Sequence, residues 1–149
     1  MATDIQQDAL TTLVLDRWTS TSGKLLDLAD AFSQDQLESR PIPETRSPAE
    51  VLRHVAFWNR YVACTLRGQA ADDSANELPR EQFATKARIL EAVDHSAKEV
   101  SMAIKDRATS LGASTLEHVV PFIEHTSEHY GQLVAHARLL GIVPPVSRT

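Results

Sequence analysis

The sequence predicts an all-α protein, a four-helix bundle with a long crossover between its second and third helices. Apolar residues recur at helical spacing over four long segments, and helix-capping residues punctuate these segments. Strand-like alternation of β-branched residues is scarce, and the chain has only five glycines. Long helices without strands bury their apolar faces against one another, which is the arrangement of a helical bundle. We expect a single domain over residues 1–149.

The first long helix is expected over about residues 5–32, and a short extra turn can begin at "SQDQ", residues 33–36. The apolar side of the first helix contains Leu10, Val14, Leu25, Leu28 and Phe32. The loop "RPIPE" follows the short turn.

The second long helix has the clearest start, at "SPAE", residues 47–50. Ser47 can cap the helix, Pro48 suits its first position, and Glu50 completes a capping box. The helix is expected to stop at Gly68, with an apolar stripe that contains Val51, His54, Val55, Trp58 and Val62. The polar stretch at residues 67–79 is the predicted crossover.

The third long helix is expected over about residues 80–107, with Phe83, Ala87, Leu90, Val93, Ala97 and Val100 on its apolar side. The fourth is expected to start at a second capping box, "STLE" at 114–117, and to run to Leu140. Gly141 suits the position after its end. Pro121 lies past the first turn of this helix, where it removes a backbone hydrogen bond and should bend the helix.

Composition argues against several classes of partner and location. The net charge is −5 and no basic run occurs, so we expect neither a nucleic-acid nor a membrane partner. The single cysteine, Cys64, cannot form an internal disulfide, which favours a reducing compartment. The first residues do not resemble a signal peptide, and no apolar run approaches the roughly 20 residues of a membrane span. We therefore expect a cytoplasmic protein.

Three of the six histidines indicate a metal site. His125 and His129 are four residues apart on one helix, which separates them by about 40° around the axis and about 6 Å along it. Their imidazoles can therefore converge on one ion. A third ligand must come from a facing helix, and His54 on the apolar stripe of the second helix is the candidate. The alternative is that His54 is a buried core residue with satisfied hydrogen bonds.

Other metal and nucleophile patterns fit less well. "HTSEH" also spells the inverted zincin motif, but no acidic ligand follows His129 anywhere in the chain. The Glu-x-x-His motif of ferritin-like di-iron bundles is missing. A hydrolase with Cys64 as nucleophile is disfavoured, because Cys64 lies about 15 Å along the helix from His54 and is expected in the core.

The chain resembles the DinB-like superfamily, the damage-inducible-protein-like bundles that include bacillithiol- and mycothiol-dependent transferases. The resemblance is carried by "LESRPIPETRSPAE", "SPAEVLRHVAFWNRYV" and "HTSEHYGQLVAHARLLGIVPP". It implies a four-helix bundle, often a homodimer, with a divalent transition metal, zinc or nickel, held by His54, His125 and His129. It also implies that the ion activates a small thiol or a water.

Two functional classes remain open from sequence. The first is a metal-dependent enzyme, either a thiol S-transferase or a small-molecule hydrolase, with a cleft at the metal lined by groups such as Trp58, Gln132 or Arg17. Glu128 could then serve as an acid or base, although Glu128 and Arg17 are also ordinary solvent-facing residues. The second class is a non-catalytic metal-binding or dimeric interaction module, with a closed site or no pocket.

Overall fold

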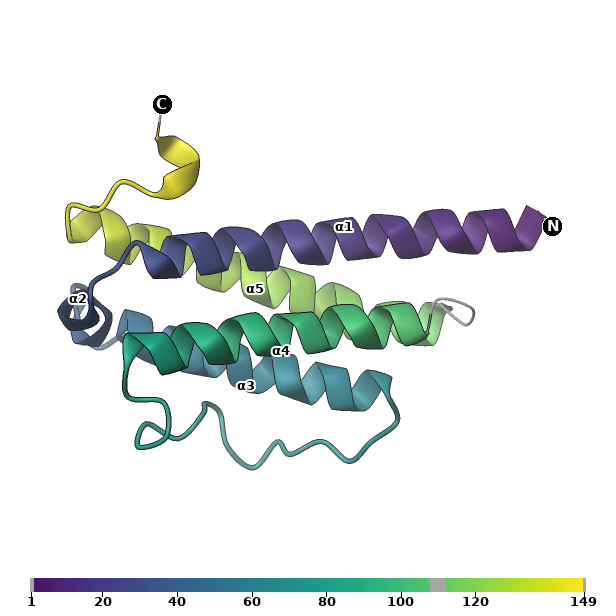
Figure 1. Ribbon diagram of the computed structural model, residues 1–149, viewed down its shortest axis with the longest axis horizontal. Coiled ribbons are helices and arrows are strands. Elements are labelled where there is room, and N and C mark those ends of the chain that lie inside the picture. Colours follow the sequence, from purple (N-terminus) through teal and green to yellow (C-terminus); the bar gives the residue numbers. More distant parts are fainter. Residues whose placement is uncertain (1, 108–111, 149) are drawn as a thin grey trace.

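The computed structural model describes residues 2–107 and 112–148, and every regular element in these ranges is helical. The elements are α1 Ala2–Asp30, α2 Gln34–Glu38, α3 Pro48–Leu66, α4 Lys86–Asp106, α5 Ala113–Leu139 and the short 3-10 helix η2 Pro145–Ser147. The predicted all-α bundle is confirmed (Figure 1). None of the described helices has the length and apolar character needed to cross a lipid bilayer.

The four long helices form a bundle in which each packs against two neighbours (Figure 1). α1 packs against α4 and α5, and α3 packs against the same two helices. α3 and α5 are therefore direct neighbours, and this places the predicted metal-binding histidines on facing helices.

The crossover predicted between the second and third long helices connects α3 to α4 (Figure 1). It returns alongside α3 to the other end of the bundle, so that α3 and α4 run in the same direction. The buried Leu78 fastens it, because its backbone N–H donates to the carbonyl of Arg53 at 3.3 Å. The crossover is thus held against the helix that carries His54.

Two of the predicted helix starts form as expected. The Ser47 side chain accepts a hydrogen bond from the backbone N–H of Glu50, and the Glu50 carboxylate accepts one from the N–H of Ser47. The short turn after residue 33 is α2, where Ser33 and Gln36 form the same reciprocal box. At the other end of the chain, Gly141 has a φ of 75°, which glycine adopts without steric cost.

The start of α4 differs from the sequence prediction. α4 begins at Lys86 rather than near residue 80, because Thr85 caps it and the Gln34 side chain accepts a hydrogen bond from the Lys86 N–H at 2.6 Å. Val93 and Val100 of its predicted apolar side are buried, whereas Ala87 is exposed and Ile89 is buried in addition. The start is therefore set partly by a contact from α2.

The capping box predicted at residues 114–117 is wrong. α5 begins at Ala113 after Gly112, which provides no side-chain cap. Ser114 lies within the first turn, where its backbone carbonyl contacts Nδ1 of His118 at 2.6 Å.

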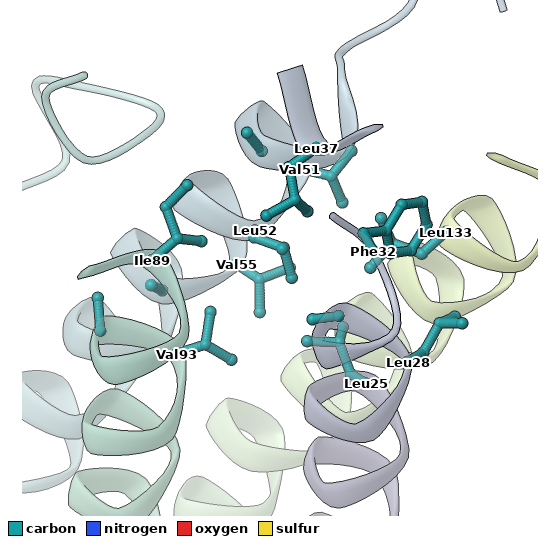
Figure 2. Packing of buried hydrophobic residues seen from close by; sticks show 14 of the residues in the cluster. Leu25, Leu28, Phe32, Leu37, Val51, Leu52, Val55, Ile89, Val93 and Leu133 are labelled. Carbon is teal, nitrogen blue, oxygen red and sulfur yellow. The ribbon is translucent and has the colours of Figure 1, made fainter. Parts of the chain in front are cut away.

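Two clusters of buried side chains fill the bundle. The larger lies toward α2 and includes Leu25, Phe32, Leu52, Ile89 and Leu133 (Figure 2). The second lies nearer the other end and is built around Trp18, whose indole N–H donates to the carbonyl of Ala97 at 2.9 Å.

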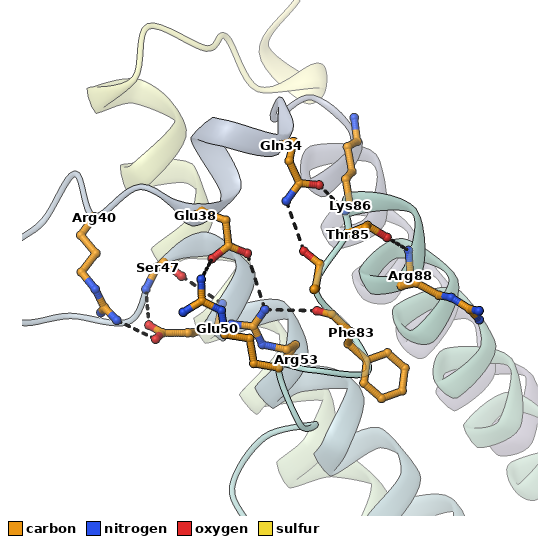
Figure 3. A network of polar contacts seen from close by, with 12 residues as sticks. Gln34, Glu38, Arg40, Ser47, Glu50, Arg53, Phe83, Thr85, Lys86 and Arg88 are labelled. Atoms are coloured by element: carbon orange, nitrogen blue, oxygen red, sulfur yellow. Dashed lines mark hydrogen bonds and ion pairs between the residues drawn. The ribbon is translucent and has the colours of Figure 1, made fainter.

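At the end of the bundle where α2 lies, a network of polar contacts links several segments of the chain (Figure 3). Arg53 is only 2% exposed, donates to the carbonyl of Phe83 at 3.3 Å and lies 3.7 Å from the carboxylate of Glu38. Its neighbour in this region, Arg40, pairs with Glu50 at 2.6 Å. These contacts hold the loop before α3 and the end of the crossover close to the start of α3.

Candidate metal centre

Three histidines from two helices meet on one side of the bundle. His54 comes from α3, and His125 and His129 come from α5. One ring nitrogen from each lies within 4.8 Å of the others. His54 is buried and the other two are half-buried. The i,i+4 spacing on α5 supplies two of them, and the packing of α3 against α5 supplies the third.

Hydrogen bonds fix the orientation of two of the rings. Nδ1 of His54 donates to the backbone carbonyl of Asn76 at 2.6 Å, and Nδ1 of His129 donates to Oε1 of Gln132 at 3.0 Å. A neutral imidazole that carries its proton on Nδ1 has a lone pair on Nε2. Both rings are therefore held in the tautomer that offers Nε2 to a metal, with an acceptor on the far nitrogen as is usual for metal-binding histidines.

The third ring completes a donor set that suits a divalent transition metal. Nε2 of His54 and Nε2 of His125 are 3.0 Å apart. Two nitrogens bound to one zinc at about 2.0–2.1 Å are separated by about 2.9–3.3 Å, for angles between 90° and the tetrahedral value. Nδ1 of His125 is buried without a partner among the described residues. Three imidazole nitrogens suit zinc, nickel, copper or iron, so these three side chains form a suitable ligand set for a divalent transition metal.

The surroundings favour the neutral form of all three histidines. Burial, followed by the positive charges of His129, His54 and Arg46, lowers the pKa of His125 to about 4. Burial is also the largest cause of the lowered pKa of His54 and of His129, and Arg46 lowers both further. A metal ligand must be deprotonated, so these lowered pKa values prepare the cluster to bind a cation near neutral pH.

The cluster opens to the surface through an apolar pocket of about 380 Å³. Trp58 and Phe122 form its aromatic wall beside His54 and His125. The indole N–H of Trp58 donates to Oδ1 of Asn76 at 2.9 Å, which fixes the orientation of the ring. Trp58 thus lines the predicted cleft, and a small molecule can reach the histidines from this side.

Of the other predicted site residues, only Gln132 forms a hydrogen bond with a histidine of the cluster among the contacts described. Gln132 contacts His129 directly. Glu128 is exposed, and its negative charge acts to raise the pKa of His129. Arg17 is exposed on α1 and does not line the pocket of the histidines.

Cys64 does not lie in the fully buried core, where the sequence placed it. It is partly exposed and lines a separate cavity of about 650 Å³ between α3 and the crossover, together with Phe57 and Tyr61. None of the three metal-site histidines lines that cavity.

A fourth histidine, His136, lies on α5 beyond His129 and outside the cluster. Its side chain is fully buried, neither ring nitrogen has a partner among the described residues, and burial lowers its pKa. Burial therefore opposes the charged form that would favour the C-terminal dipole of α5.

Sequence reasoning missed two residues of the site. Asn76 supplies the carbonyl for His54 and the amide oxygen for Trp58, and Arg46 acts electrostatically on all three histidines. Both lie in loops, where no periodicity marks a functional position. The position of Arg46 immediately before the capping serine of α3 was the only available signal.

Comparison with known proteins gave one family. The DinB superfamily matches residues 17–136, which include His54, His125, His129 and the crossover. Neither the curated proteins nor the solved structures gave a match.

Proposed function

The chain belongs to the DinB superfamily, and on that premise we propose that it is a metal-dependent enzyme acting on a small molecule. His54, His125 and His129 would hold the ion, zinc or nickel. Three protein ligands leave a position open, which is typical of catalytic rather than structural zinc sites. When bound, the ion supplies Lewis-acid activation, lowering the pKa of a small thiol or of a water molecule. The reaction would be thiol S-transfer or hydrolysis.

The observation that carries this proposal is the convergence of three ring nitrogens, two of them in a fixed tautomer. The Asn76 carbonyl and Oε1 of Gln132 accept hydrogen bonds from Nδ1–H of His54 and of His129, so Nε2 of each ring carries the lone pair that a metal can bind. A histidine in a core also needs an acceptor for its N–H, so the distinguishing feature is that the three rings bring one nitrogen each within 4.8 Å of the others.

The residues around the cluster support a substrate pocket. Trp58, held by Asn76, and Phe122 would bind the apolar part of a small molecule and exclude water from one side of the histidines. Glu128 is exposed, its charge acts on His129, and it is an acidic candidate for proton transfer.

Elemental analysis of protein purified without a histidine tag tests the metal site. The wild type should contain a stoichiometric divalent metal, and the His54→Ala and His129→Ala variants should lose it. His118→Ala, a change on α5 outside the cluster, should retain it. A wild type that stays empty after incubation with zinc, nickel, copper and iron would refute the proposal. A loaded protein would then be screened for thiol transfer and hydrolysis.

The competing proposal is a non-catalytic metal-binding or dimeric interaction module. It is favoured by exposed apolar side chains after and near the end of α5: Leu139 and Val146 are each 63% exposed. A homodimer that covers them would be seen by light scattering, and loss of the dimer in a Leu139→Glu/Val146→Glu variant would place the interface there. Dimerisation is compatible with either function, so only the activity screen separates them.

A further inference from the structure

A cation without a partner lies in the loop that leads into α3. Arg46 is half-buried and directly precedes the capping residue Ser47. Among the described residues, no carboxylate lies within 4.0 Å of its guanidinium and its side chain makes no hydrogen bond. Arg40, in the same loop, is paired with Glu50 at 2.6 Å (Figure 3). The two arginines therefore differ: the charge of Arg40 is neutralised by an ion pair within the protein, and that of Arg46 is not.

Arg46 lies beside the histidine cluster. It lines a surface hollow of about 430 Å³ together with Asn76, and Asn76 also lines the pocket over His54 and His125. The carbonyl of Asn76 is 2.6 Å from Nδ1 of His54. The hollow of Arg46 and the pocket of the histidines are thus adjacent, with Asn76 as their common wall.

The position of Arg46 is unfavourable for metal binding by itself. A fixed positive charge near a site for a divalent cation repels that cation. The charge becomes favourable when a bound molecule brings an anionic group into the hollow, because guanidinium binds carboxylates through paired hydrogen bonds.

Besides Arg46, the charged residues of the same hollow are Arg40, Glu44, Glu50 and Glu77. Glu44 is exposed to solvent. Glu50 is already bonded to Arg40 and to the N–H of Ser47. Glu77 lines the hollow as well, and its Oε2 is buried without a partner. The alternative is that the Glu77 side chain rotates and forms an ion pair with Arg46, which would leave the guanidinium unavailable to a bound carboxylate.

We propose that Arg46 binds a carboxylate on the substrate while the reactive thiol or scissile group of that substrate lies at the three histidines. The inference rests on the proposed function and adds the substrate class, a small carboxylate-bearing molecule. Arg46 is a binding and specificity residue in this arrangement and takes no part in the chemical step.

Calorimetric titration of the zinc-loaded full-length protein tests this proposal. The probes are mercaptoacetate and 3-mercaptopropionate, each compared with the alcohol of the same length, 2-mercaptoethanol or 3-mercaptopropan-1-ol. The wild type should prefer at least one acid over its alcohol by about tenfold, the size of one charge-assisted hydrogen bond. The preference should disappear in Arg46→Ala and be partly kept in Arg46→Lys. Arg88→Ala, at an exposed arginine of α4 that lines neither the hollow nor the pocket of the histidines, is the control and should retain it.

A second readout does not depend on any organic ligand. At low ionic strength Arg46→Ala should bind zinc roughly twofold to fivefold more tightly than the wild type, because a repulsive charge is gone. Arg88→Ala should leave zinc affinity unchanged. A merely structural role for Arg46 would not tighten zinc binding.

The outcomes separate this inference from the proposed function. Equal binding of acids and alcohols by the wild type, or a preference that survives in Arg46→Ala, overturns the role of Arg46 and leaves the metal site standing. If only Glu77→Gln prefers the acids, Glu77 pairs with the Arg46 guanidinium in the wild type. That result also overturns the role of Arg46 in binding a substrate carboxylate. A protein that holds no zinc, or whose zinc binds no thiol, refutes the proposed function and this inference with it.

Discussion

Replacing Gln132 by leucine is expected to weaken zinc binding without removing a metal ligand. Oε1 of Gln132 accepts the Nδ1 proton of His129 at 3.0 Å and holds the ring with Nε2 free. Loss of such a partner typically costs tenfold to a hundredfold in metal affinity, or about 1.4–2.8 kcal/mol. Gln132 is only partly buried, so water can replace some of the hydrogen bond. We therefore expect about tenfold to thirtyfold weaker binding.

Gln132→Glu is expected to change zinc affinity in the opposite direction, which makes the test specific for the hydrogen bond to His129. A carboxylate accepts the same proton through a stronger, charge-assisted hydrogen bond and adds a negative charge near the ion. Zinc binding by this variant should be as tight as in the wild type or tighter. A general disturbance of α5 would instead weaken binding in both variants.

Competition with a chelator of known zinc affinity, at fixed pH and ionic strength, measures these changes. Gln69→Leu, at an exposed glutamine of the crossover, is the control for the substitution itself. Urea unfolding of the metal-free variants checks that the fold is intact. The reasoning would be refuted if Gln132→Leu bound zinc within twofold of the wild type, or if Gln132→Glu bound it more weakly than Gln132→Leu.

Three further predictions concern stability. Ser47→Ala removes the cap that accepts the Glu50 N–H and should lower the free energy of unfolding by about 1 kcal/mol in urea titrations; an unchanged midpoint would contradict this. Leu52→Ala empties a fully buried position and should cost about 2–5 kcal/mol, so a loss under about 1 kcal/mol would show that the site collapses. The metal-free protein should be most stable above about pH 6.5 and should lose about 1–3 kcal/mol as the pH falls toward 4. The reason is that burial lowers the folded-state pKa of His125 to about 4, so the unfolded chain binds more protons in this window. In His125→Asn the free energy of unfolding should change less with pH. If it changes with pH as steeply as in the wild type, other titrating groups are responsible.

Much of the fold could be predicted because its signals are local. The capping boxes at Ser33 and Ser47 each bring together residues three positions apart, and backbone geometry alone sets that distance. The pairing of His125 with His129 is local in the same sense, since an i,i+4 spacing puts two side chains on one face of any helix. These features need no knowledge of how the helices pack.

Two predicted helix starts were wrong, and a distant contact accounts for one of them, the start of α4. "STLE" has the residues of a capping box, yet α5 begins at Ala113, two residues before the start that a Ser114 cap would give, and the box is not formed. α4 starts at Lys86, where the side chain of Gln34 accepts its N–H from 52 residues away. Local propensity is a weak preference, and a tertiary hydrogen bond of this kind is enough to move a boundary by several residues.

The sequence by itself determined the helices, the crossover and the helical face on which each histidine lies, because these depend on short-range periodicity and capping. Only the tertiary structure decided that α3 packs beside α5, and so that His54 meets His125 at 3.0 Å. It also decided the positions of Asn76 and Arg46, which reach the site from loops. A loop has no repeating geometry, so its contacts are set by where the packed helices place its two ends.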